Sequence, residues 1–403
     1  MTEVSVQSVQ TGSVQNPRVT WEGCSVLLDI NDGDRLVFAR LSAGATLKIG
    51  NKQCSLQPLI GCSFGSLFQV ESGPKGPYLS RVIAPAEGDL PEKGDCLLKD
   101  ESRDNRSLVD DNTAQSLSGE DIEALRRQGA TGDQIVEALI ANSSTFEKKT
   151  LFSQEKYRLK KQKKYAPRVL VRRPFTRSIC ETYFKKNPAK IGFMRVDTLS
   201  LLLSMANVCA YSDVLVVDMV GGILTGAVAE RLGGSGYVCN TYFGGVPYPM
   251  DITRMFNLNN EISSRIVQTS LSDLCSAQDK NSEQGGENGV KEVTHLWRAN
   301  GFSSLIVAAP ELDTWSAVQE LLPLLSYSAP FAVYHQYLQP LATCMHNLQV
   351  SKMAIGLQIS EPWLREYQVL PSRTHPSMQM SAFGGYILSG TRIFSSEISQ
   401  QTS

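Results

Sequence analysis

Short apolar runs separated by turn residues characterise residues 18–75. A β-hairpin with its turn around Asp32-Gly33 is predicted by the two apolar runs of CSVLLDINDGDRLVFARL (24–41). Similar runs follow, separated by Gly50-Asn51, Gly61 and Gly65, and they favour a small barrel or sandwich. Residues 72–104 carry prolines, glycines and charges without a clear period, so a loop is expected there.

Helical signals begin after this loop. Three helix starts are predicted by a hydroxyl residue followed three positions later by an acid or amide: Ser118 with Asp121, Thr131 with Gln134, and Ser144 with Glu147. Gly129 lies where the first helix should end. The third helix should run from about Thr145 to Lys164 and becomes increasingly basic.

Strands and helices alternate from Asp213 onward. Helix-like segments separate strand-like ones such as VLVVDM (214–219), SSLIVAAP (303–310) and PFAVYHQY (330–337). This alternation is typical of a parallel sheet wrapped by helices. A strand is also predicted at RVLVRRP (168–174), a helix at VDTLSLLLSMANV (196–208), and a disordered surface insertion at the polar residues 276–292.

The predicted elements divide the chain into four parts. They are a flexible tail (1–17), a β-rich domain with its loop (18–116), a helical and strongly basic connector (117–195), and an α/β domain (196–396) that holds the insertion. The polar N-terminus lacks the apolar core of a secretory signal, and no stretch of about 18 uncharged apolar residues predicts a membrane span.

The first strand-to-helix turn of the α/β domain lies in VLVVDMVGGILTGAVAERLGG (214–234). A doubly wound sheet binds its cofactor at such a turn, where glycines let the backbone approach the ligand. A class I S-adenosylmethionine methyltransferase would carry an acid followed by glycines at alternate positions. In that register Val220 and Leu224 replace two of the three glycines, and Gly222 alone remains. We call residues 218–224 the donor loop.

Two further features of a working site are missing. The second strand, GYVCNTYF (236–243), ends with Thr241 and Tyr242 where an acid should accept the ribose hydroxyls. The fourth strand ends with Ala308 and Ala309 beside Pro310, where methylation of a ring nitrogen usually needs a carboxylate or amide. We therefore expect no catalytic residue and no cofactor-binding residue in this chain.

Charge is distributed unevenly along the chain. The formal net charge is −1, yet residues 148–195 hold 16 of the 39 Lys and Arg residues and only two acids, Glu155 and Glu181. Basic residues interleaved with Tyr157 and Tyr165 can contact phosphates and stack on bases. A solvated helix face is the alternative explanation, but such a face normally also carries acids. The stretch KKQKK (160–164) is also compatible with nuclear localisation.

The block 105–165, the segment VLPSRTHPSMQMSAFGGYILSG (369–390) and the degenerate α/β core resemble one family. This family is the non-catalytic subunit of the eukaryotic tRNA adenosine-58 N1-methyltransferase, and the resemblance covers roughly residues 18–395. It implies a degenerate, Rossmann-like class I methyltransferase fold preceded by a small β-rich domain. Ala308 matches the position of the Asp that the family's catalytic subunit carries after its fourth strand.

The resemblance also implies partners and a location. The chain would bind tRNA and assemble with a catalytic paralogue, as a nuclear heterotetramer of two copies of each subunit. S-adenosylmethionine is expected on the paralogue only. The final strand, entered through Gly384-Gly385, is expected to pack or pair with the partner.

The candidate RNA-contacting residues form a polar loop, the basic segment and a late group of polar and basic residues. They are Asn105, Arg106, Gln154, Lys156, Tyr157, Arg158, Lys160, Lys161, Lys163, Lys164, Arg172, Arg173, Lys185, Lys186, Lys190, Gln336, Arg365, Arg373 and His375. Trp363 and Tyr367 lie in the same late loops. They are either further RNA-contacting residues or residues of the core or of a subunit interface.

Two other functions are compatible with the same sequence. One is an active S-adenosylmethionine-dependent RNA methyltransferase with an atypical donor loop, and the other is a scaffold that contacts little RNA. No metal site is expected, because the nine cysteines and four histidines are dispersed. Asp110-Asp111 are expected to order their loop, since no histidine or further acid is placed to help them bind a metal.

Overall fold

The chain forms two compact units, Met1–Arg173 and Pro174–Ser403. The computed structural model describes residues 16–73, 76–82, 115–276, 288–370 and 373–394. The segment 117–195, expected to be one connector, is shared between the two units. It is divided because its strand β7 (Arg168–Arg172) hydrogen-bonds between β1 and β5 in the sheet of unit 1.

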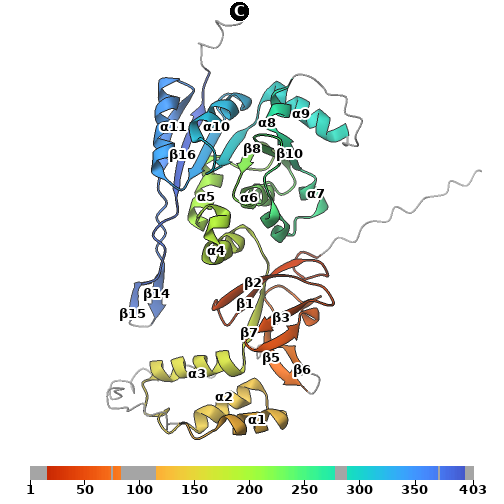
Figure 1. Cartoon of the computed structure of the whole chain (residues 1–403), viewed down its shortest axis with the longest axis vertical. Helices are drawn as coiled ribbons and strands as arrows, with labels where there is room; N and C mark the ends of the chain where they lie inside the picture. The colour runs from red at the N-terminus through yellow and green to blue at the C-terminus, as the bar shows by residue number, and fades with distance from the viewer. Residues whose placement is uncertain (1–15, 74–75, 83–114, 277–287, 371–372, 395–403) are drawn as a thin grey trace, which may run out of the picture. The chain divides into compact units, whose positions relative to one another are not determined.

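Unit 1 is built on an open antiparallel sheet of order β2-β1-β7-β5-β6 (Figure 1). The other strands of this unit are β1 (Ser25–Ile30), β2 (Arg35–Arg40), β3 (Thr46–Ile49), β4 (Lys52–Ser55), β5 (Leu67–Gly73) and β6 (Gly76–Arg81), with a 3-10 turn η1 (Gln57–Leu59). The predicted β1–β2 hairpin is confirmed, and Asp32 and Gly33 in its turn have positive φ. The hairpin β3–β4 shares one apolar core with the sheet, which gives a sandwich rather than a closed barrel.

The loop predicted at 72–104 is wrong in its first part. β5 continues to Gly73, and β6 pairs with it as far as Arg81. Pro77 is tolerated because β6 is an edge strand, where a missing N–H group removes no ladder hydrogen bond. Residues 83–104 lie outside the described part of the chain.

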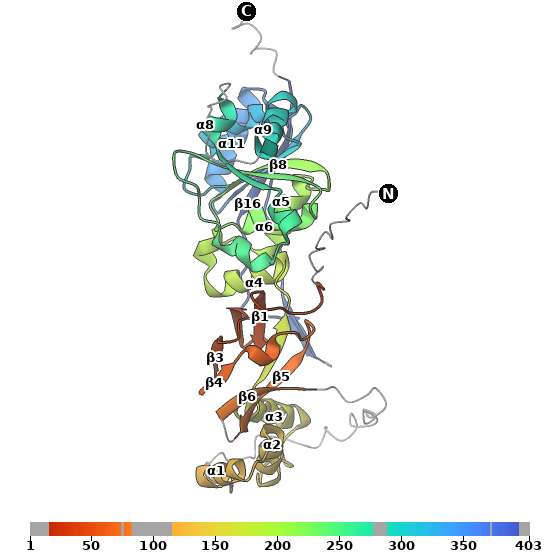
Figure 2. The same ribbon diagram turned by 90° about the vertical axis from the view of Figure 1, so that its right-hand side faces the viewer.

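The described part of unit 1 also contains the helices α1 (Gly119–Arg127), α2 (Gly132–Ala141) and α3 (Leu151–Tyr165) (Figures 1 and 2). The first two predicted helix starts are confirmed as capping boxes, and Gly129 follows the end of α1 at φ +87°. The third is wrong. Residues 144–149 form turns, and α3 begins after Thr150, whose side chain accepts a hydrogen bond from the N–H of Ser153.

Unit 2 contains the predicted α/β sheet, of order β10-β9-β8-β11-β12-β16-β13. The first five strands are parallel, while β16 is antiparallel to both β12 and β13. The strands are β8 (Ser212–Asp218), β9 (Gly236–Tyr242), β10 (Ile266–Ser270), β11 (Ser304–Ala308), β12 (Pro330–His335), β13 (Ala354–Ser360) and β16 (Tyr386–Arg392). A separate hairpin, β14 (Tyr367–Leu370) with β15 (Arg373–Pro376), extends between β13 and β16.

Helices cover both faces of this sheet (Figure 2). Its helices are α4 (Thr176–Lys186), α5 (Val196–Met205), α6 (Ile223–Leu232), α7 (Asn260–Ser263), α8 (Leu271–Cys275), α9 (Asn288–Asn300), α10 (Thr314–Leu321) and α11 (Leu338–Val350), with 3-10 turns η4 (Pro188–Ile191), η5 (Asp251–Phe256) and η6 (Leu322–Leu324). The core on one face joins Leu215, Val307 and Val333 of the strands to α8–α11, while α5 and α6 pack on the other face.

Two expectations for unit 2 need correction. The insertion predicted at 276–292 ends inside a helix, because α9 already begins at Asn288; residues 277–287 lie outside the described part of the chain. The final strand is confirmed as β16, but both of its edges are paired within its own sheet, so it has no free edge for a partner strand. No helix in the described ranges is long and apolar enough to cross a lipid bilayer.

Candidate nucleic-acid interface

The donor loop is tied to its own carboxylate. Asp218, at the end of β8, is fully buried, and its Oδ1 accepts hydrogen bonds of 3.0 Å from the N–H groups of Val220 and Gly222. Its Oδ2 accepts from the N–H (2.9 Å) and the hydroxyl (3.0 Å) of Thr225. Burial raises the pKa of Asp218 above its ordinary value, although these hydrogen bonds oppose the rise. These three backbone N–H groups therefore bind the carboxylate of Asp218 and are not available to a ligand.

A second segment covers the two glycines of the donor loop. The N–H of Ile252, in η5, donates to the carbonyl of Gly221 at 3.0 Å, and the Thr253 hydroxyl donates to the carbonyl of Gly222 at 2.9 Å. A Cβ on Gly222 would lie only 2.7 Å from the Cα of Met250. The glycines therefore allow the close approach of this chain's own backbone.

The remaining positions of a donor site are apolar or occupied. Val220 and Leu224 are both fully buried in the unit's own packing. At the end of β9, Thr241 is buried, and the ring of Tyr242 packs edge-on against Tyr248 at 6.3 Å. Ala308, the last residue of β11, is also fully buried. The structure thus places no carboxylate at either strand end, as the residue types predict.

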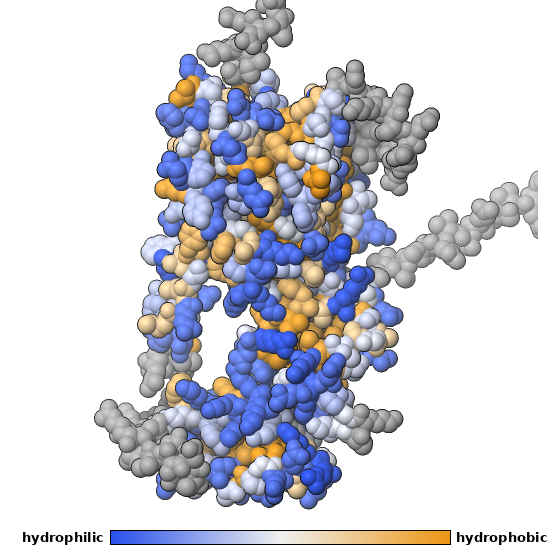
Figure 3. Space-filling model, in the orientation of Figure 1, coloured by the Kyte–Doolittle hydropathy of each residue, from blue (hydrophilic) through white to orange (hydrophobic). Residues whose placement is uncertain are grey.

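The basic surface of α3 has the opposite character. Lys156, Lys160 and Lys164 follow one another at helical spacing on one face, and all three are exposed, as is Arg158. None of the three lysines has a carboxylate within 4.0 Å in the described ranges. Figure 3 shows a predominantly hydrophilic surface along this helix.

Two other predicted residues of α3 serve the packing of unit 1. The ring of Tyr157 packs edge-on against Phe146 at 5.7 Å, and the ammonium groups of Lys149 and Lys161 lie 5.0 and 5.1 Å from its centroid. The amide of Gln154 donates to the carbonyls of Phe146 and Lys149. Both side chains hold the turn before α3, which leaves Tyr157 poorly placed to stack on a base.

Several predicted cations already have partners. The ion pairs are Lys163 with Asp34 (2.7 Å), Arg172 with Asp29 (3.2 Å) and Lys190 with Asp251 (3.4 Å). Arg173 and Lys186 also make contacts, whereas Lys185 is exposed at the end of α4. Lys185, Lys186 and Lys190 belong to unit 2, and Asn105 and Arg106, like Asp110 and Asp111, lie outside the described residues.

The late predicted group lies partly on the hairpin β14–β15, which holds Tyr367, Arg373 and His375, and partly in the segments before it. Trp363 precedes it and is 77% exposed, with the guanidinium of Arg365 4.8 Å from its ring centroid. Tyr367 and His375 are exposed on the two strands, and Arg373 begins β15. The sixth, Gln336, is half-buried just after β12 and does not belong to the hairpin. Trp363 and Tyr367 are therefore not core residues of this chain.

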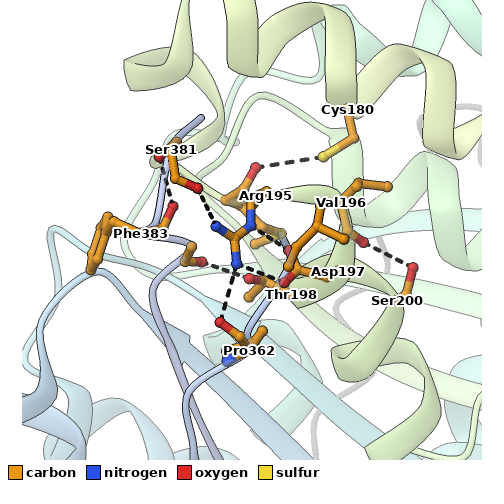
Figure 4. Close-up of polar contacts among 12 residues, drawn as sticks. Cys180, Arg195, Val196, Asp197, Thr198, Ser200, Pro362, Ser381 and Phe383 are labelled. Atoms are coloured by element: carbon orange, nitrogen blue, oxygen red, sulfur yellow. Dashed lines mark hydrogen bonds and ion pairs between the residues drawn. The ribbon is translucent and has the colours of Figure 1, made fainter. Parts of the chain in front are cut away.

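The base of this hairpin is held by a residue that sequence analysis does not single out (Figure 4). Arg195 is 4% exposed and binds both carboxylate oxygens of Asp197 at 2.7 and 2.8 Å. It also donates to the carbonyls of Ser381 (2.7 Å) and Pro362 (3.1 Å), one on each side of the hairpin. These two carbonyls are far away in sequence, so the sequence holds no local signal for the role of Arg195 at the hairpin.

Two further cations of unit 1 are also missed by sequence analysis. Lys52 of β4 and Arg126 of α1 lie beside the C-terminal end of α3, where they line one groove together with Lys163 and Lys164. Neither Lys52 nor Arg126 lies in a basic run such as 160–164, so composition does not mark them. No group of three or more potential metal ligands occurs among the residues that the structure describes.

The fold and the donor loop define the class of protein. The structure resembles that of an S-adenosylmethionine-dependent O-methyltransferase from Thermotoga maritima, with a TM-score of 0.52 and 12% identity over 94% of this chain and 96% of that one. The chain therefore has a class I methyltransferase fold, with a small β-rich domain before it and a donor loop filled by its own residues.

Sequence comparison gives the family. Residues 21–296 match the Gcd10p family, and the chain belongs to it. It is 34% identical to the tRNA (adenine(58)-N(1))-methyltransferase non-catalytic subunit trm6 of Dictyostelium discoideum over 92% of this chain and 79% of that protein. The non-catalytic subunit of Mus musculus is 30% identical over 92% and 89%. The chain is a non-catalytic member of this methyltransferase family.

Proposed function

We propose that this non-catalytic subunit binds tRNA through the exposed face of α3 and leaves methyl transfer to a catalytic partner. The observation that carries the proposal is the row of lysines at 156, 160 and 164, which is exposed and has no carboxylate within 4.0 Å among the described residues. Unpaired cations in such a row favour a polyanion, because phosphate contacts release bound counterions. The names of the relatives specify the polyanion, since those proteins are subunits of a tRNA methyltransferase.

We also propose that this chain does not bind S-adenosylmethionine. The carboxylate of Asp218 accepts hydrogen bonds from two backbone N–H groups of the donor loop, those of Val220 and Gly222, and from the Thr225 N–H that follows it, while η5 covers the glycines of the loop. The ends of β9 and β11 lack the carboxylates that would hold ribose or the methylated base. Calorimetry with the purified chain should detect no binding of S-adenosylmethionine at micromolar concentration. A micromolar Kd for S-adenosylmethionine would overturn this part of the proposal.

The partner follows from the relatives' names. We propose assembly with a catalytic paralogue that binds S-adenosylmethionine, as a heterotetramer of two copies of each subunit. The basic stretch at 160–164 supports a nuclear location. Methylation of a tRNA transcript should appear only when both chains are co-expressed, and the mass of the purified complex by light scattering tests the stoichiometry. Methylation by this chain alone would contradict the proposal.

RNA binding is tested by reversing charge on α3. The double variant Lys156→Glu/Lys160→Glu should lower tRNA affinity about tenfold to hundredfold, and the slope of log affinity against log salt should fall by about 2. Fluorescence anisotropy with labelled tRNA between 50 and 200 mM salt measures both.

The matched control is Lys48→Glu/Arg127→Glu, which reverses two exposed cations of the same unit on β3 and α1 rather than on α3. The control should change tRNA affinity by less than about twofold, because isolated surface charges contribute little. Equal affinity of both double variants would contradict RNA binding by α3 and favour the scaffold function.

A further inference from the structure

A groove of about 470 Å³ lies in unit 1 between the hairpin β3–β4, helix α1 and the C-terminal end of α3. We call it the cation groove, because four basic side chains line it: Lys52, Arg126, Lys163 and Lys164. They come from β4, α1 and α3, so the tertiary fold brings them together. The volume is within the range of about 300–1,000 Å³ that is typical of small-ligand sites.

Carboxylates do not balance these four cations. Arg126 has Glu123 at 3.9 Å, and Lys163 has Asp34 at 2.7 Å. Lys52 and Lys164 have no carboxylate within 4.0 Å among the described residues, and Lys52 donates to the Ser72 hydroxyl at 2.7 Å. Burial and then the nearby charge of Arg126 lower the pKa of Lys52. The groove thus holds positive groups that an incoming anion would stabilise.

The cations are held in place from within. The ring of Tyr165 has the Arg126 guanidinium at 5.8 Å and the Lys164 ammonium at 5.1 Å from its centroid. Tyr165 itself packs against the small apolar core of α1 and α2 that includes Ile122. Because this ring is already engaged, the groove offers fixed charges rather than a surface for base stacking, which suits a phosphate better than a base.

We infer that the cation groove binds a phosphate group of the RNA backbone. The inference rests on the proposed function, because Lys163 and Lys164 belong both to the groove and to α3. An RNA strand bound along the exposed face of α3 would bring one of its phosphates to Lys52 and Arg126 at the C-terminal end of the helix. An acidic peptide is the other polyanion that such a site could attract. RNA is the favoured ligand because the groove continues the surface of α3 that is proposed to bind tRNA.

The test uses the full chain in complex with its catalytic partner and labelled tRNA. The groove variant Lys52→Gln/Arg126→Gln should lower tRNA affinity about tenfold and reduce the salt slope by about 1. The control Lys48→Gln/Arg127→Gln removes a neighbouring pair of charges from the same two elements, hairpin β3–β4 and helix α1, outside the groove. It should bind tRNA within about twofold of the parent. Circular dichroism melts check that both variants fold.

The outcomes separate this inference from the proposed function. If the groove variant binds like its control while Lys156→Glu/Lys160→Glu binds weakly, the inference is wrong and RNA binding by α3 stands. If neither variant weakens binding, both the inference and the proposed RNA binding by α3 are wrong.

A competition experiment identifies the source of the phosphate. An unlabelled RNA oligonucleotide should displace the tRNA at far lower concentration than adenosine monophosphate or inorganic phosphate. Equal competition by free phosphate or by polyglutamate would overturn the assignment to RNA.

Discussion

The donor loop of unit 2 and the α3 surface of unit 1 handle their polar groups in opposite ways. In the donor loop, the carboxylate of Asp218 and the N–H groups around it bind one another. On α3, Lys156, Lys160 and Lys164 face solvent with no carboxylate within 4.0 Å among the described residues. Buried polar groups that satisfy each other stabilise a fold, whereas exposed unpaired charge favours a ligand. The comparison shows how a fold can lose its chemistry while a binding surface remains.

The largest expected effect comes from removing the carboxylate at the centre of the donor loop. Asp218→Ala leaves three N–H groups and one hydroxyl without their acceptor in a fully buried site. We expect the free energy of unfolding to fall by about 3–5 kcal/mol. Urea unfolding followed by tryptophan fluorescence measures it, since three of the four tryptophans lie in unit 2.

Activity distinguishes a structural Asp218 from a catalytic one. Asp218→Asn keeps one acceptor oxygen, and at a temperature where it is folded the complex should methylate tRNA at the parent rate. Asp251→Ala, a change at an exposed carboxylate in the same unit, is the stability control and should cost little. Methylation lost in folded Asp218→Asn would show that the donor loop still takes part in the reaction.

The same contrast between buried and exposed groups applies to the base of the hairpin β14–β15. Arg195→Met removes four hydrogen bonds of a buried guanidinium and leaves Asp197 without its partner. We expect a loss of about 2–4 kcal/mol in the free energy of unfolding. Amide exchange should also become faster at residues 361–366 and 377–384, which flank the hairpin.

Its matched control is an exposed ion pair of the same unit. Arg177→Met breaks the pair with Glu181, one helical turn away on α4, where the arginine side chain is 71% exposed. Such a pair contributes about 0.3–0.5 kcal/mol, so exchange around the hairpin should not change. If Arg177→Met and Arg195→Met have equal effects, the buried cluster does not position the hairpin.

Sequence analysis succeeds for these regions where residue type alone decides. Val220 and Leu224 lack the small size, and Ala308 lacks the polar group, that their positions need, so the sequence predicts neither donor binding nor catalysis at this site. The alternation of apolar runs likewise predicts the sheet of unit 2, since each strand is identified from its own residues. These inferences need no knowledge of what packs against what.

The sequence cannot give features that depend on contacts between distant segments. It gives no sign that η5 covers Gly222, that Arg195 binds two carbonyls 167 and 186 residues away, or that Lys52 and Arg126 line one groove. Tyr157 illustrates the same limit, because its position beside lysines predicts stacking, whereas Phe146 holds its ring in the packed turn. Such roles are determined by tertiary packing.

The smallest expected effect concerns pH and the buried histidine at the end of β12. His335 is 6% exposed, and its Nδ1 accepts a hydrogen bond from the Tyr337 N–H at 2.9 Å. Burial lowers its pKa below the ordinary 6.5, although hydrogen bonds to backbone groups oppose this. Above pH 6.5 the imidazole is neutral in both the folded and unfolded chain. As pH falls below 6.5, the unfolded chain takes up a proton that the folded chain resists, so stability declines until the folded pKa is reached.

The unfolding free energy of His335→Gln should lack this part of the decline between pH 7.5 and 5, whereas His346→Gln, at an exposed position on α11, should keep it. Identical pH profiles for the parent and His335→Gln would mean that the buried imidazole titrates like that of the unfolded chain, and that polar groups of unit 2 are less isolated from solvent than the donor loop indicates.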